Sequence, residues 1–508
     1  MFQITLRHSL LIHVLALAWW ITPCLAQPEN PVYVNDSPQA WLLFQQARDQ
    51  RKDNVGESAR LYQKLLDEYG LKLIPTSTLD DTHFASVRSR VLRELTDYPE
   101  LLKRYRLIQT TAAQRMLEAR QLEHTAQSYS LTEPGLEAIL QLGQRHLESG
   151  AFQLAKHWLD EAIKHADLDE RRAIHAWHMI GMATWYLQQP KEFEEILERL
   201  GSYQDGSTLH DHLVWLRREG PGPVQQQGRT SLDPSEAYDL GELISEDIWS
   251  VPLEHSLMNR RYPINPENPT QGRDVRKDKS EKAILNTATP TIAGEVVYIN
   301  EGHTIHALDR FTGRSIWATP FTDQNDDRLK EINTENTMDL NIVSVQDGAL
   351  VTLTGHLLPR ERSNNGHVLC LDAASGEKRW HKDVSFIDEA DEFERLFPHG
   401  QPLIAENSVY ILARKTRKQQ LTATYVIALD LHDGSLRWIR HISTSGAIRG
   451  TARPFSTIAY DRGSLFVATT LGSIARLEAH DGEIRWLNRY PVPLNPGASS
   501  LHKPWEFD

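Results

Sequence analysis

A short motif that occurs four times in the second half of the chain constrains the fold more than any other feature. Each copy has an acidic residue, a glycine four positions later and a tryptophan four positions after that. The twelve residues are Asp309, Gly313, Trp317, Asp372, Gly376, Trp380, Asp430, Gly434, Trp438, Glu478, Gly482 and Trp486. A short apolar run precedes each copy. Four copies in register predict a repeated structural unit.

Each part of the motif suits a strand, a turn and a returning strand. The acidic side chain can accept hydrogen bonds from turn amides, and glycine can adopt the positive φ that ends the turn. Tryptophan on the returning strand offers a large apolar ring and one donor, which suits it to docking on a neighbouring sheet. We therefore expect the twelve motif residues to be structural and the tryptophans to be buried between blades of a propeller.

Residues 307–317 resemble the tryptophan-docking motif of pyrroloquinoline-quinone (PQQ)-type propellers, and the resemblance extends over residues 286–491. That superfamily includes the quinoprotein alcohol dehydrogenases and a non-enzymatic propeller lipoprotein of the outer-membrane barrel-assembly machinery. The fourth copy departs most from the pattern, because Glu478 replaces the aspartate and Arg476 replaces the alanine of the first and third copies. The resemblance implies a quinoprotein-type propeller.

The propeller is expected to occupy residues 246–508 with about four to five blades, whereas such propellers commonly close with about eight. An element at 248–252, with Trp249, resembles the outer strand of a preceding blade. Polar insertions are expected to form loops or poorly ordered segments, at 255–285, 323–340, 358–365 and 414–420. The ring need not close within this chain. The chain could be the N-terminal fragment of a larger multidomain exported protein, contain degenerate blades, or bind a partner that completes the ring.

Residues 37–218 have the periodicity of amphipathic helices. The clearest stretch resembles a tetratricopeptide repeat, with Gly143 allowing close helix contact and Ala155 and Ala162 on the second helix. A second copy begins at Trp177 and places Gly181 where the first has Gly143. Stacked helix pairs would form a surface that takes peptides, and a helical spacer is the alternative. The predicted fold class is α+β multidomain, with N-terminal helical repeats followed by an all-β propeller.

The segments before and after the helical half indicate export and a domain boundary. Residues 1–26 have the basic, apolar and small-residue order of a signal peptide, so we expect the chain in the periplasm or outside the cell, without a membrane span after cleavage. Residues 219–245 begin with Gly and Pro and are expected to be a linker that leaves the two halves separable. The remaining cysteine, Cys370, lies in an alternating apolar run typical of a buried strand.

Composition and motifs favour binding over catalysis. A net charge of -13 argues against a nucleic-acid partner. The enzymes of the resembled superfamily use an adjacent cysteine pair over the quinone, and this sequence has none. We also find no Walker loop, zincin motif, serine elbow or Cys/His zinc spacing. The sequence predicts no catalytic, cofactor-binding or metal-binding residue and no cofactor. It favours an exported scaffold that binds a protein or peptide through the helical repeats or the propeller face, and a PQQ-dependent dehydrogenase-like enzyme remains the alternative.

Overall fold

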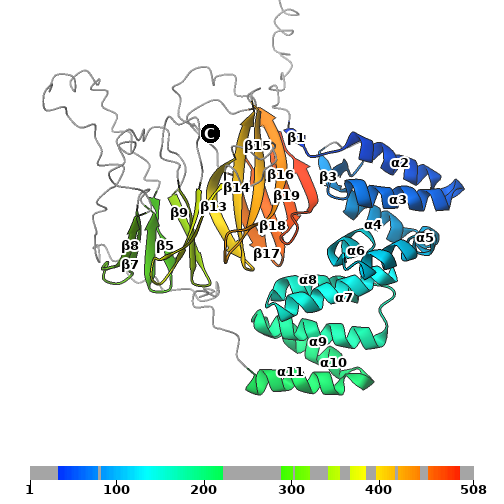
Figure 1. The fold of residues 1–508 in the computed structure, drawn as a ribbon, viewed down its shortest axis with the longest axis horizontal. Helices are drawn as coiled ribbons and strands as arrows, with labels where there is room; N and C mark the ends of the chain where they lie inside the picture. The colour runs from blue at the N-terminus through cyan, green and yellow to red at the C-terminus, as the bar shows by residue number, and fades with distance from the viewer. Residues whose placement is uncertain are drawn as a thin grey trace, which may run out of the picture.

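The computed structural model has a helical half and a half built of antiparallel sheets (Figure 1). It describes residues 32–77, 82–220, 288–300, 304–320, 341–354, 367–384, 396–417, 421–446 and 456–491. The signal segment, the linker beyond residue 220, the Trp249 element and the insertions at 255–285, 323–340 and 358–365 lie outside these ranges. The predicted α+β layout is confirmed, and the sheets do not close into a ring within the described residues.

Ten α-helices form the helical half of the described chain. They are α2 (Pro38–Asp53), α3 (Val55–Tyr69), α4 (Val87–Asp97), α5 (Pro99–Glu118), α6 (Leu122–Ser128), α7 (Glu133–Glu148), α8 (Phe152–Ile163), α9 (Glu170–Tyr186), α10 (Pro190–Gly201) and α11 (Ser207–Glu219), with a short 3-10 turn, η1 (Gln204–Gly206). Polar caps begin several of them, and Asp169 accepts a hydrogen bond from the amide of Arg172 at 2.8 Å. None of the described helices combines the length and apolarity that a membrane crossing requires.

Small residues let these helices approach closely, as the repeat pattern predicts. A Cβ atom on Gly143 of α7 would lie 2.7 Å from the side chain of Leu159 on α8. A Cβ atom on Gly181 of α9 would lie 2.4 Å from Leu213 on α11. Ala155 and Ala162 are fully buried on α8. Each helix therefore buries its apolar face on its neighbours rather than alone.

Four sheets, which we call blades 1 to 4, follow one another along the chain. Blade 1 contains β5 (Thr291–Ala293), β6 (Val296–Asn300), β7 (Thr304–Asp309) and β8 (Ser315–Pro320). Blade 2 contains β9 (Asn341–Gln346), β10 (Ala349–Thr354), β11 (His367–Asp372) and β12 (Lys378–Asp383), with β4 (Ala288–Thr289) beside β9. Blade 3 contains β13 (Phe397–Ala405), β14 (Ser408–Arg417), β15 (Leu421–Asp430) and β16 (Leu436–Gly446), and blade 4 contains β17 (Thr457–Asp461), β18 (Ser464–Thr469), β19 (Ser473–Glu478) and β20 (Ile484–Arg489). In every blade the third strand ends at the acidic motif residue and the fourth carries the tryptophan.

One predicted loop is partly a strand. The polar residues from Arg414 to Arg417 continue β14 and pair in register with the first four residues of β15. Their polarity suggested a loop from residue 414 onward. The hydrogen bonds of an antiparallel hairpin join main-chain groups, however, so polar side chains do not prevent it from forming. The insertion expected at 414–420 is therefore corrected, because only residues 418–420 lie outside the two strands.

A repeated hydrogen bond joins each blade to the next. The indole Nε1 atoms of Trp317, Trp380 and Trp438 donate to the main-chain oxygens of Ala373, Leu431 and Ala479, at 3.1, 2.8 and 3.0 Å respectively. Each acceptor directly follows the acidic residue of the next motif. The ring covers the motif glycine of that next blade, where an added Cβ would lie 2.6 to 2.8 Å from the indole. Trp380 is 7% exposed, and the rings of Trp317 and Trp438 are partly buried.

We predict that Gly434→Ala destabilises the propeller more than Gly294→Ala does. Both glycines have a positive φ, 71° and 60°, so both substitutions introduce backbone strain of about 1 to 2 kcal/mol. Only at Gly434 would the new methyl group also clash with Trp380, for a total of about 3 to 5 kcal/mol, because nothing lies within 4 Å at Gly294. Chemical denaturation measures the difference. In a Trp380→Ala background the Gly434→Ala cost should fall to the Gly294→Ala value, and an unchanged cost would disprove the docking interpretation.

The helical half adds strands to the outer edges of the last two blades. β1 (Val32–Val34) pairs antiparallel with β16 of blade 3. β3 (His83–Ser86) pairs with β20 of blade 4, and β2 (Leu73–Pro75) pairs with β3, so blade 4 becomes a six-stranded sheet. The helices accordingly lie beside blade 4, on the side away from blade 1 (Figure 1). Both outer edges, which would otherwise present unpaired backbone groups, are covered in this way.

A buried ionic network reinforces this junction. Arg88, at the start of α4, contacts Glu483 at 2.6 Å and Asp481 at 3.1 Å in the last turn of blade 4. The Ser86 hydroxyl donates to the Glu483 carboxylate at 2.5 Å. Burial alone would raise the pKa of Asp481, but its interactions with His480 and Arg88 outweigh burial and lower that pKa from 3.8 to about 2. The expectation of separable halves was drawn from the linker alone and did not include these contacts.

Suppose that a recognition site for a specific protease is introduced at residues 225–227 and then cut. We predict that the two resulting fragments stay associated at pH 7. Among the groups that lower the pKa of Asp481, Arg88 lies across the junction, so the contribution of this pair to the association is complete above about pH 4 and is lost as the pH falls toward 2. Size-exclusion chromatography of the cut chain over this pH range measures the association.

The cut chain also allows a matched test of the network. Arg88→Ala should weaken the association by about 3 to 5 kcal/mol, because it removes the cation that pairs with two buried carboxylates across the junction. Arg60→Ala removes an exposed pair with Glu57 and should change nothing measurable. Release of the helical fragment at pH 7 from the unsubstituted chain would contradict the junction.

Candidate functional site

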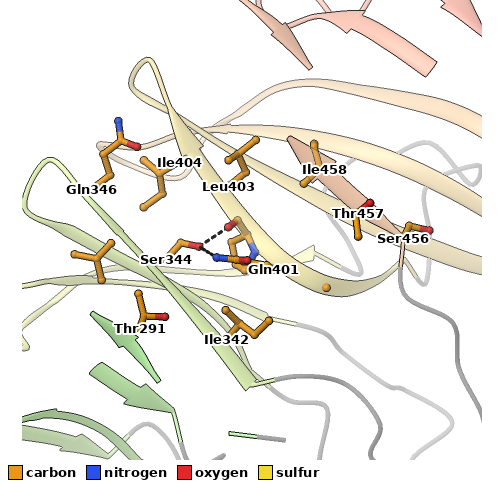
Figure 2. Close-up of a pocket in the computed structure, with 13 residues that line it drawn as sticks. Thr291, Ile342, Ser344, Gln346, Gln401, Leu403, Ile404, Ser456, Thr457 and Ile458 are labelled. Atoms are coloured by element: carbon orange, nitrogen blue, oxygen red, sulfur yellow. Dashed lines mark hydrogen bonds between the residues drawn. The ribbon is translucent and has the colours of Figure 1, made fainter. Parts of the chain in front are cut away.

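A cavity of about 440 Å³ lies where the first strands of the four blades meet (Figure 2). Thr291 of β5, Ile342 and Gln346 of β9, Gln401 of β13 and Thr457 of β17 contribute to its wall. In a propeller the first strand of each blade faces the central axis. The cavity therefore occupies the axial side of the array, where propellers commonly hold ligands.

An irregularity in β13 shapes this cavity. The register with β14 shifts between His399 and Leu403, and Gly400 has a φ of 77°. Such a bulge re-aims side chains, and Pro402 within it has no amide hydrogen to lose from a ladder. The Ser344 hydroxyl donates to the Pro402 main-chain oxygen at 2.5 Å and accepts from the side-chain amide of Gln401 at 3.2 Å. Figure 2 marks the hydrogen bonds of Ser344 as dashed lines. The bulge thus connects blade 3 to blade 2.

The cavity wall is uncharged. Amide and hydroxyl groups from Gln346, Gln401 and Thr457 alternate with aliphatic side chains such as Leu403 and Ile458. No lining residue in the described part of the chain is an acid, a base or a thiol. This wall can therefore form neutral hydrogen bonds and apolar contacts with a ligand. The sequence analysis did not identify it, although the Gly-Gln-Pro sequence at 400–402 inside a strand pattern was an available signal of a bulge.

The predicted motif aspartates lie at the turns between the third and fourth strands and do not line the cavity. Asp309 accepts hydrogen bonds from the amide and hydroxyl of Thr312, both at 2.7 Å. Asp372 accepts from the amide of Ser375 at 3.0 Å and pairs with Arg379 at 2.7 Å, and the bond from Arg379 is the main reason that its pKa falls to about 2. Asp430 repeats both roles, with the amide of His432 and with Arg437.

Glu478 and Cys370 complete the predicted set of notable residues. Glu478, which replaces the aspartate in blade 4, pairs with Arg485 at 2.6 Å and faces His157 of α8 at 3.9 Å. Cys370 is fully buried in β11, and burial raises the pKa of its thiol to about 11. A thiol with so high a pKa is a poor nucleophile at neutral pH, which agrees with the expected buried strand cysteine.

The repeat geometry and one family model agree on what the blades are. The model described as outer membrane protein assembly factor BamB matches residues 423–498, which include most of β15 and all of β16 to β20 in blades 3 and 4. Two of the four blades thus match a PQQ-like repeat family. The N-terminal half is consistent with helical repeats, and no curated protein matches the chain.

Solved structures show only distant likeness. The quinohemoprotein alcohol dehydrogenase of Comamonas testosteroni is 18% identical with a TM-score of 0.30, over 40% of this chain and 35% of the enzyme. BamB of Moraxella catarrhalis is 16% identical with a TM-score of 0.21, over 38% of this chain and 58% of that protein. The chain thus spans about a third of the length of the alcohol dehydrogenase. Scores this low support no conclusion on function.

The cavity does not fit the quinone that PQQ-type enzymes use. Pyrroloquinoline quinone is a polycarboxylate, so a protein that binds it needs cationic or metal partners. The described lining residues include no lysine or arginine. The full sequence contains two cysteines, Cys24 and Cys370, which are far from adjacent. We therefore derive no chemical step through a quinone at this cavity.

We predict that Ser344→Ala destabilises the chain by about 1 to 3 kcal/mol. The substitution leaves the Pro402 carbonyl and the Gln401 amide without the hydroxyl that links them. Ser456→Ala, also in the wall and 3% exposed, is the matched control, since no hydrogen bond from its hydroxyl is found in the described structure. Thermal unfolding of both variants measures the difference. Equal effects would mean that the bulge does not depend on Ser344.

Proposed function

We propose that this chain is an exported, non-enzymatic scaffold that binds a protein segment at the axial cavity of its propeller. The uncharged wall of that cavity is the observation that carries the proposal. A peptide backbone offers neutral donors and acceptors, which the amides of Gln346 and Gln401 can pair with, and Ile342 and Leu403 can pack on an apolar side chain. The described lining residues carry neutral amide, hydroxyl and aliphatic groups, which suit a peptide better than acid–base chemistry.

The joined halves support the same proposal. The helical half is held on blade 4 by shared strands and a buried ionic network, so the two parts present their surfaces in a fixed relation. A scaffold benefits from this arrangement because binding does not then have to order one half against the other. Export to the periplasm or beyond the cell is part of the proposal. It rests on the basic and apolar order of residues 1–26 and on the match to a BamB model.

The binding proposal can be tested by site-specific photo-crosslinking in the source cells. A photoreactive residue at Thr457, which is exposed at the cavity rim, should yield one discrete cross-linked polypeptide of the cell envelope. The same residue at Glu377, which is exposed at the turn of blade 2, is the matched control and should yield none. Mass spectrometry identifies the product. Identical cross-linking from both positions, or none from Thr457, would contradict a binding site at the cavity.

A dye-reduction assay tests the alternative that the chain is a quinone-dependent dehydrogenase. The purified chain, supplied with pyrroloquinoline quinone and Ca²⁺, should not reduce a redox dye in the presence of alcohols or sugars, because the described lining residues include no cationic side chain to hold the quinone. A quinoprotein dehydrogenase of known activity serves as the positive control. Dye reduction above the level of the free quinone would overturn the scaffold proposal in favour of a dehydrogenase.

A further inference from the structure

Three possible metal ligands meet where the helical half contacts blade 4. His157 comes from α8, Glu478 from the end of β19, and His480 from the turn that follows. One ligand atom from each residue lies within 4.8 Å of the other two. Their side chains are largely buried, with exposed fractions of 20%, 6% and 14%. Residues from two distant parts of the sequence are brought together here only by the docking of the helical half.

We propose that His157, Glu478 and His480 bind a divalent transition-metal ion, with Zn²⁺ as the preferred ion, that ties the helical half to blade 4. Two imidazoles and one carboxylate form a known three-ligand set for zinc, with a water in the fourth position. Tetrahedral Zn²⁺ with bonds of about 2.0 to 2.1 Å places its ligand atoms about 3.3 Å apart. The three ligand atoms would therefore have to approach one another by up to roughly 1.5 Å, which side-chain rotations can supply.

Neighbouring groups already orient two of the ligands. Arg485 holds one oxygen of Glu478 at 2.6 Å, and the other oxygen faces the Nδ1 atom of His157 at 3.9 Å. The carboxylate of Asp481 lies 3.6 Å from the Nε2 atom of His480, close enough to orient that ring. The rings of His157 and His480 lie 4.5 Å apart, and Trp158 packs edge-on against His480 at 5.2 Å. The site thus has an apolar wall on one side and a carboxylate behind one ligand.

Blade 4 breaks the repeat at the position that faces the helices. In blades 1 to 3 the motif aspartate accepts hydrogen bonds from the amides of its own turn. In blade 4 Glu478 keeps the arginine pairing of blades 2 and 3, here with Arg485, but no bond from a turn amide to its carboxylate is found in the described structure, and its second oxygen faces His157. Blade 4 is also the blade against which the helical half packs. The departure from the motif therefore coincides with a contact between this turn and α8.

The charges around the cluster set the expected affinity. Three carboxylates, on Glu478, Asp481 and Glu483, are balanced by Arg88 and Arg485. Arg440 donates to the main-chain oxygens of Asp481 and Gly482, and Arg476 lies 3.7 Å from Glu478. Because these arginines repel a dication, we expect a dissociation constant on the order of micromolar rather than nanomolar.

Titration of the metal-free full chain with Zn²⁺ in a calorimeter tests the proposal. We expect one ion per chain, and His157→Ala and His480→Ala should each weaken binding at least about 100-fold, because each removes one ligand of three. His432→Ala is the matched control, since His432 occupies the same turn position in blade 3 and is exposed. Arg476→Ala should tighten binding by roughly 3- to 10-fold, because it removes a positive charge near the ligating carboxylate.

A second measurement keeps the proposal testable if a variant fails to fold. Co²⁺ added to the unsubstituted chain should give the visible absorption of a tetrahedral site, and Zn²⁺ should displace it. Three outcomes would overturn the site: Zn²⁺ binding that neither histidine substitution weakens, Zn²⁺ binding that is lost in His432→Ala, or the absence of a tetrahedral Co²⁺ spectrum. These outcomes leave the cavity cross-linking unaffected, so failure here and failure of the proposed scaffold function can be told apart.

Discussion

The contact between a tryptophan and the next glycine holds the strand half together. The indoles of Trp317, Trp380 and Trp438 each lie over a glycine of the next blade and donate to a nearby main-chain oxygen, so one hydrogen bond and one close apolar contact recur at all three junctions between the four blades. An indole ring removes a large apolar area from water, and a buried donor must be paired. Both needs are met only if the neighbouring blade is in place. The blades therefore stabilise one another in sequence rather than singly.

The second constraint on the structure is the outer edge of each blade. A four-stranded blade ends in a strand whose backbone groups are paired on one side only. In blades 3 and 4 the N-terminal segment supplies the missing partners through β1 and β3. The helical half is thereby fixed to the propeller by backbone hydrogen bonds, which do not depend on side-chain identity, and Arg88 adds a specific ionic contact. The same docking brings α8 to the turn of blade 4 and creates the His157, Glu478 and His480 cluster.

The axial cavity lies at the other edge of the blades, which is formed by their first strands. First strands of adjacent blades converge there, and the bulge at Gly400 places Gln401 and Pro402 against Ser344 of the preceding blade. Uncharged polar groups then alternate with aliphatic ones around a volume that can take a peptide segment or a small ligand. The blades of this propeller fix the position of the site, and loop and bulge residues decide its chemistry.

The sequence by itself determined the repeat. Because an acidic cap, a positive-φ glycine and a docking tryptophan are local requirements, their fixed spacing identified the strands, the turns and the PQQ-like blades, and Gly143 and Gly181 likewise marked the close helix contacts. The tertiary structure alone decided what lies between distant segments. β1, β2 and β3 are too short to stand out by pattern, and the bulge at residues 400–402 has meaning only beside blade 2. His157 and Glu478, more than 300 positions apart in the printed sequence, meet because backbone pairing at a blade edge carries no signal in side-chain periodicity.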